Sequence, residues 1–81
     1  MNECIGLHQL KVGQKATVVT QRHKGEMRRR LQDIGLVEKS TVECVGKSPF
    51  GDPRAYLVCG AVIALRKKDA FDILVCPVKG E

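Results

Sequence analysis

The sequence predicts a mostly β fold, a small and partly open barrel with one or two short α-helices. Two observations lead to this prediction. Short apolar stretches recur at even spacing, with a helical stretch and turn residues between them, as in small barrels. Aromatic side chains are few (Phe50, Tyr56 and Phe71), and a barrel limits the sheet edges that such a chain would otherwise leave exposed.

The strands are expected in a regular order along the chain. A short N-terminal segment ends at the turn residues Val12-Gly13, and alternating apolar residues predict a strand at 15–21. Further strands are expected at 40–45, 54–59 and 62–65, a second helix at 67–74, and a closing strand at 75–78. In this second helix Ala70, Ile73 and Leu74 are expected to face inward.

The stretch between Gly25 and Gly35 predicts the first helix. Met27, Leu31 and Ile34 fall at i, i+4 and i+7, which places them in one apolar stripe. Gly25 is the expected N-cap, and Gly35 can end the helix with a positive φ. We therefore predict that the helix packs into the core through this stripe.

Three consecutive arginines, Arg28–Arg30, lie on this helix. Successive helical residues point about 100° apart, so the three side chains fan over more than half of the circumference. A solvated helix face is therefore the favoured interpretation, and a phosphate-binding site is the alternative.

Length and charge restrict the function classes. A chain of 81 residues predicts one domain over residues 1–81, without room for a catalytic domain beside a binding domain. Its net charge of +5 favours acidic partners, anionic lipid surfaces or RNA. The first residues do not resemble a signal peptide, and no apolar run is long enough to span a membrane. We therefore expect a cytoplasmic protein without direct membrane insertion.

The four cysteines are expected to be reduced structural thiols: Cys4, Cys44, Cys59 and Cys76. No C-x-x-C pair occurs, and Cys44 and Cys59 are expected inside apolar strands. His8 and His23 lie 15 residues apart in different contexts. The sequence therefore predicts neither a metal site nor a bound cofactor.

Motifs of catalysis are absent from the sequence. It contains no P-loop, no G-x-G-x-x-G and no G-x-S-x-G. No nucleophile, base and orienting group are expected to converge. We predict that the chain is not an enzyme and has no catalytic residues.

Four groups of residues between about Leu7 and Val75 together resemble the ferrous iron transport protein A (FeoA) family. The groups are Leu10-Lys11-Val12-Gly13-Gln14, Arg29-Arg30-Leu31-Gln32-Asp33-Ile34-Gly35-Leu36, Pro49-Phe50-Gly51-Asp52-Pro53, and Gly60 through Ala64-Leu65-Arg66-Lys67 with Ala70 and Ile73 after it. One turn departs from the family, because Val37-Glu38-Lys39-Ser40 stands where a Pro-Gly turn is usual. A positive φ there would strain Lys39.

The resemblance implies an SH3-like barrel and a regulatory role. The chain would be a non-enzymatic cytosolic accessory of a FeoB-type membrane ferrous iron transporter and would act by protein–protein contact on the transporter's cytosolic part. Weak self-association stays open. One alternative is a small basic nucleic-acid-binding barrel, supported by Arg28–Arg30 and Arg66–Lys68 but disfavoured because the aromatic residues form no stacking platform. The other alternative is a transition-metal-binding or sensing domain, for which ligand spacing is missing.

The loop of Pro49, Phe50, Gly51, Asp52 and Pro53 is the predicted partner-binding site. Two prolines stiffen it, and it is longer than a two-residue hairpin connection. Phe50 is interpreted as an anchor that enters a pocket of the partner, with Asp52 holding the turn of the loop. The alternative is that Phe50 folds under as a lid on one end of the barrel.

Overall fold

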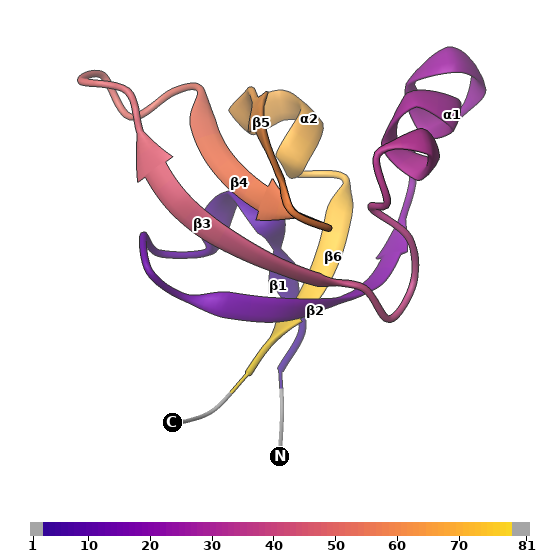
Figure 1. Cartoon of the computed structure of the whole chain (residues 1–81), viewed down its shortest axis with the longest axis horizontal. Helices are drawn as coiled ribbons and strands as arrows, with labels where there is room; N and C mark the ends of the chain where they lie inside the picture. Colours follow the sequence, from indigo (N-terminus) through magenta and orange to yellow (C-terminus); the bar gives the residue numbers. More distant parts are fainter. Residues whose placement is uncertain (1–2, 79–81) are drawn as a thin grey trace.

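The structure is a computed structural model that describes residues 3–78, in which six antiparallel strands form one sheet (Figure 1). The strand order is β1-β6-β2-β3-β4-β5. The elements are β1 (Ile5–Gly6), the 3-10 helix η1 (Leu7–Gln9), β2 (Lys15–Gln21), α1 (Gly25–Asp33), β3 (Thr41–Lys47), β4 (Arg54–Val58), β5 (Ala61–Leu65), α2 (Lys67–Ala70) and β6 (Ile73–Pro77). The prediction of a mostly β fold with one or two short α-helices is confirmed, since two are present among the described residues. The domain predicted over 1–81 includes residues 1–2 and 79–81, which lie outside the described part.

Two register shifts interrupt the sheet. One lies between Val18 and Thr20 where β2 pairs with β6, and the other lies between Cys44 and Gly46 where β3 pairs with β4. Such bulges bend a strand and increase its twist. They occur in the strands that curve across the molecule in Figure 1, while α1 stands at one side, between β2 and β3. The bulges therefore help one sheet to curl around a core.

The core is largely aliphatic and draws on nearly every element. Its buried members are at most 8% exposed: Leu7, Leu10, Ala16, Val18, Leu31, Leu36, Val42, Cys44, Tyr56, Val58, Leu65, Ala70, Ile73 and Val75. Alternate residues of β2 and β3 enter it, as the period of a strand requires. The strand predicted at 15–21 is confirmed at both of its ends.

Helix α1 packs through the predicted stripe. Leu31 is buried, and Met27 and Ile34 are partly buried against the core. The helix ends in a Schellman motif, because the Leu36 N–H donates to the Leu31 carbonyl at 2.9 Å and Gly35 has a φ of 97°. The expected N-cap is wrong by one residue, since Lys24 occupies that position and the helix begins at Gly25. Small shifts of this kind are common at helix ends.

The second helix is shorter than predicted. It covers only Lys67–Ala70, and Ile73 begins strand β6 instead of continuing the helix. The spacing of Ala70 and Ile73 fits either structure, and both residues are buried as expected. Pairing of β6 with β2 decides the outcome: Ile73 lies opposite Gln21, and β-branched residues suit a strand.

Two non-glycine residues adopt a positive φ in turns. Lys39 has a φ of 74°, so the turn that departs from the family pattern does require a left-handed residue. Cys59 has a φ of 51° and forms, with Gly60, the two-residue turn between β4 and β5. Positive φ at both positions is typical of a type I′ hairpin. Cys59 is consequently exposed, and its predicted burial in a strand is wrong, whereas Cys44 is buried as predicted.

None of the helices within residues 3–78 has both the length and the apolar character that a membrane crossing requires.

We expect Leu31→Ala to lower the free energy of unfolding by about 2–5 kcal/mol, because it leaves a cavity in the core. Leu31 is 2% exposed and packs on the buried side of α1. Arg29→Ala on the exposed side should change it by only about 0–1 kcal/mol. Urea unfolding of both variants measures the difference, and equal losses would contradict the packing of α1 through its stripe.

We also expect Gly35→Ala to destabilise the fold more than Gly13→Ala. Both glycines have a positive φ, 97° and 91°, so each alanine pays a similar backbone cost of about 1–2 kcal/mol. A Cβ at Gly35 would collide with the Cys59 Sγ, whereas a Cβ at Gly13 meets open space. Overpacking should add about 1–3 kcal/mol at Gly35. Equal urea midpoints of the two variants would show that Cys59 yields without cost.

Candidate functional site

The β3–β4 loop is closed by its own backbone and exposes its tip. The Ser48 N–H donates to the Pro53 carbonyl at 3.1 Å, and the Gly51 N–H donates to the Ser48 carbonyl at 2.8 Å. Phe50 at the tip is 95% exposed. The lid interpretation is therefore wrong, since a lid would bury this ring. Partner binding by residues 49–53 stays a prediction.

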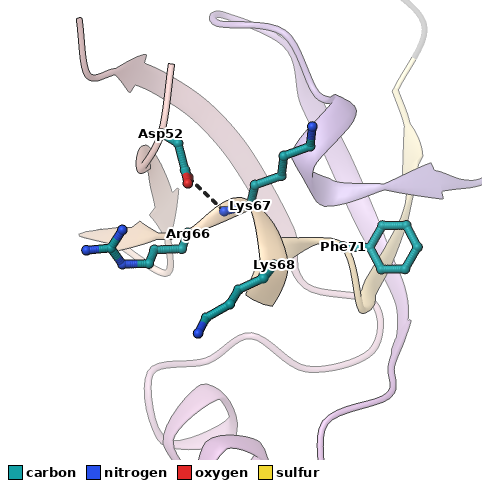
Figure 2. Close-up of a pocket in the computed structure, with 5 residues that line it drawn as sticks. All are labelled: Asp52, Arg66, Lys67, Lys68 and Phe71. Carbon is teal, nitrogen blue, oxygen red and sulfur yellow. Dashed lines mark hydrogen bonds between the residues drawn. The ribbon is translucent and has the colours of Figure 1, made fainter. Parts of the chain in front are cut away.

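Asp52 joins this loop to helix α2. Its Oδ1 accepts a hydrogen bond of 2.7 Å from the backbone N–H of Lys67 (Figure 2). The first N–H groups of a helix lack partners within the helix, and this carboxylate supplies one. The prediction that Asp52 holds the turn of its own loop is thus wrong, because its carboxylate contacts an element 15 residues away in sequence.

Arg54 ties the loop to the N-terminal segment. Its Nη1 donates to the Leu10 carbonyl at 2.8 Å, and its Nε donates to the Gly51 carbonyl at 3.5 Å. Both hydrogen bonds are part-buried. With Asp52 on one side and Arg54 on the other, the loop is held to two separate parts of the molecule.

Helix α2 presents basic side chains and one aromatic ring beside the loop. Arg66, Lys67 and Lys68 are exposed, and Phe71 is 57% exposed. Together with Asp52 they line an open concavity of about 590 Å³. Figure 2 shows the Lys67 and Lys68 side chains pointing to opposite sides of the start of α2, with Phe71 beyond them.

A second concavity adjoins the first. It has a volume of about 330 Å³, and its lining includes His8, Phe50, Arg54 and Lys67. The ring of His8 also lies against Phe71, with 5.3 Å between ring centroids. Asp52 and Lys67 line both concavities, so the two form one continuous area. We call it the loop–α2 surface: His8, Phe50, Asp52, Arg54, Arg66, Lys67, Lys68 and Phe71.

The loop–α2 surface has a positive field. Burial lowers the pKa of His8, and the positive charges of Lys67 and Arg54 lower it further. His8 Nδ1 is shielded from solvent and has no hydrogen-bond partner among the described residues. Burial raises the pKa of neighbouring Tyr56 to about 12, and its hydroxyl donates to the Leu7 carbonyl at 3.5 Å. The exposed rings of Phe50 and Phe71 lie beside basic side chains on this surface, a combination that can bind a partner with both apolar and acidic groups.

Clustered metal ligands are not found within residues 3–78, where no three His, Cys, Asp or Glu side chains come together. The two histidines lie in different surroundings. His8 belongs to the loop–α2 surface, whereas His23 Nε2 lies 2.7 Å from the Asp69 carbonyl oxygen.

Sequence reasoning found only part of this surface. It singled out residues 49–53 but did not connect them with His8, Arg54 or Phe71. Phe71 falls within the helix predicted at 67–74, and nothing in its sequence context indicates that it belongs to a binding surface. The basic run of Arg66–Lys68 is a signal for this surface in the sequence, where it supports the nucleic-acid alternative and where Arg66-Lys67 also belongs to the FeoA-like groups.

The model of the FeoA domain family matches residues 5–77 of this chain. The chain is 32% identical over 69 residues to the Fe(2+) transport protein A/Fe(2+) transporter FeoB fusion protein of Porphyromonas gingivalis. This match covers 85% of the chain but only 8% of that relative's length.

Solved structures are also similar to this chain. The FeoA-like protein of Clostridium acetobutylicum has a TM-score of 0.85 at 33% identity, over 100% of this chain and 94% of that one. Stenotrophomonas maltophilia FeoA in complex with zinc, a prokaryotic SH3 domain protein, has a TM-score of 0.75 at 28% identity, over 93% of this chain and 88% of that one. The predictions of a FeoA-like sequence and an SH3-like barrel are confirmed.

The lowered pKa of His8 predicts a loss of stability in acid. Below the unfolded-state value of 6.5 the unfolded chain takes up a proton that the folded chain resists, so the free energy of unfolding should fall as the pH drops from 6.5 through the lower folded-state pKa. His8→Gln should flatten this part of the profile, measured by urea unfolding. An unchanged profile would contradict the role of His8.

Lys67→Gln gives a matched test of the positive field. Removal of this charge should raise the pKa of His8 toward 6.5, without restoring it fully, because burial is the larger cause. An NMR titration of the imidazole signals measures the shift. Lys24→Gln, which removes an exposed charge beside α1, should leave the pKa of His8 in place.

Proposed function

Because this chain belongs to the FeoA family, we propose that it is a non-enzymatic, cytoplasmic accessory that regulates a FeoB-type ferrous iron transporter by direct contact. The family is linked to ferrous iron transport and is not a known enzyme family. The S. maltophilia relative has been put forward as a ferrous iron transport activating factor, which supports a regulatory role.

The observation that carries the proposal is the fusion protein of P. gingivalis. A chain 32% identical to this one lies there in the same polypeptide as FeoB. Fusion keeps two domains at a high effective concentration, which favours pairs that act on each other. A domain that acts on its partner by direct contact needs a docking surface.

The loop–α2 surface meets the requirements of such a docking surface. Phe50 is a large apolar side chain that is 95% exposed at the tip of a loop. The hydrogen bonds of Asp52 and Arg54 hold this loop in place before any partner binds. A preorganised aromatic anchor loses little conformational entropy on docking and commonly carries much of the binding energy of an interface. We assign residues 49–53 as the centre of the contact.

Phe50→Ala should weaken binding to the cytosolic part of the transporter by more than about 1 kcal/mol. The urea midpoint should stay nearly unchanged, because a ring that is 95% exposed adds little to the core. Isothermal titration calorimetry measures the affinity. Val62→Ala is the matched control, since Val62 is also exposed, at 63%, but lies on β5 outside the loop–α2 surface.

Equal affinity of wild type and Phe50→Ala for the transporter would show that Phe50 is not an anchor of the contact. Absence of any binding to the transporter would overturn the accessory role itself. A salt titration with a mixed oligonucleotide examines the nucleic-acid alternative, since phosphate contacts give an affinity that falls steeply with salt. Tight, salt-sensitive binding of the oligonucleotide, with none of the transporter, would favour that alternative.

A further inference from the structure

The charges of the loop–α2 surface are strongly one-sided. Two positively charged side chains face the second concavity from separate elements, Arg54 from β4 and Lys67 from α2. The imidazole of His8 from η1 lies beside them, and their charges help to lower its pKa. The acidic side chain among them, Asp52, already accepts the Lys67 backbone N–H. Like charges that face one concavity raise the free energy of the unoccupied surface, and a bound anion would relieve it.

We propose that the loop–α2 surface receives an acidic segment of the partner, with a carboxylate in the concavity of His8, Arg54 and Lys67 and an apolar neighbour of that carboxylate against Phe50. The inference rests on the proposed function for the identity of the partner, and it names the chemistry by which that partner is recognised.

Arg54 is the best-positioned group for such a carboxylate. Its hydrogen bonds to the Leu10 and Gly51 carbonyls use two of the five N–H donors of a guanidinium. These bonds fix the plane of the group and leave other donors free, and a fixed guanidinium suits the two oxygens of a carboxylate. Lys67 adds a second positive charge on an exposed side chain that lines the same concavity. Its backbone stays anchored by Asp52.

The aromatic residues distinguish an acidic peptide from a simple anion. Phe50 lines the same concavity as Arg54 and Lys67, and Phe71 packs on His8 at its border. Free phosphate would use the charges but leave both rings in water. A peptide that alternates acidic and apolar side chains would use both features. The concavity of about 330 Å³ is large enough for side chains of this size.

An NMR titration of the intact, isotope-labelled chain tests this inference directly. The probe is a short capped peptide that alternates Glu and Leu, and its control replaces every Glu by Gln. The Glu peptide should shift the backbone signals of the β3–β4 loop and α2, and the Gln peptide should bind about tenfold more weakly. Absence of shifts at these residues, or equal binding of the Gln peptide, would overturn the proposal.

Two lysine variants form the matched pair. Lys67→Gln should weaken the Glu peptide about threefold to fivefold, whereas Lys24→Gln, with the same loss of charge at the start of α1, should leave the affinity unchanged. Lys24 makes no side-chain capping hydrogen bond, and α1 stands on the other side of the molecule from the β3–β4 loop (Figure 1). Equal weakening by both variants would indicate a general effect of net charge and would overturn the site.

Other anions are outcomes of the same titration. Inorganic phosphate should compete weakly, because it cannot contact Phe50. A mixed oligonucleotide or phosphatidylglycerol vesicles that bind more tightly than the Glu peptide, and shift the same residues, would replace the acidic peptide as the occupant.

The transporter separates this inference from the proposed function. Lys67→Glu should abolish binding of the transporter's cytosolic part if an acidic segment docks here. Intact binding by Lys67→Glu, with loss in Phe50→Ala, would overturn the acidic segment and leave the accessory role standing. Specific binding of the Glu peptide without any binding of the transporter would overturn the accessory role instead.

Discussion

A single sheet has to enclose the core of this small chain, and the curvature of that sheet is the constraint on which the other elements depend. The two bulges, at Val18/Thr20 and at Cys44/Gly46, lie in the strands that bend across the molecule. In the curved sheet η1 contacts both α2 and β6, although it is distant from them in sequence. The helices α1 and α2 add Leu31 and Ala70 to the core that the strands enclose only in part.

This way of building the core determines where the aromatic residues lie. The single tyrosine, Tyr56, is buried and uses its hydroxyl on the Leu7 carbonyl, while the two phenylalanines, Phe50 and Phe71, are both exposed. Burial of large apolar rings normally contributes favourably to stability. Two such rings left in water on one surface, beside basic side chains, are better explained by recognition of another molecule than by the needs of the core.

Hydrogen bonds join the parts of the loop–α2 surface to one another. Asp52 connects the β3–β4 loop to α2, and Arg54 connects it to the residues after η1. Each hydrogen bond joins a side chain to a backbone group, so the contacts depend on a few polar residues. The side chains that remain exposed, Phe50, Lys67 and Lys68, are thereby presented on fixed backbone and remain free to contact a partner.

The sequence by itself determined the fold class, the strand at 15–21, and the packing of α1 through Met27, Leu31 and Ile34, because these features follow from the period of apolar residues along the chain. It also pointed to the loop around Phe50. Tertiary structure decided the rest. The residues from Ile73 onward, for which a helix is predicted, form a strand because they pair with β2. Cys59 lies in a type I′ turn and not in the sheet. Such pairings join residues far apart in sequence, and no local period reports them. The meeting of His8, Asp52 and Lys67 on one surface depends on them.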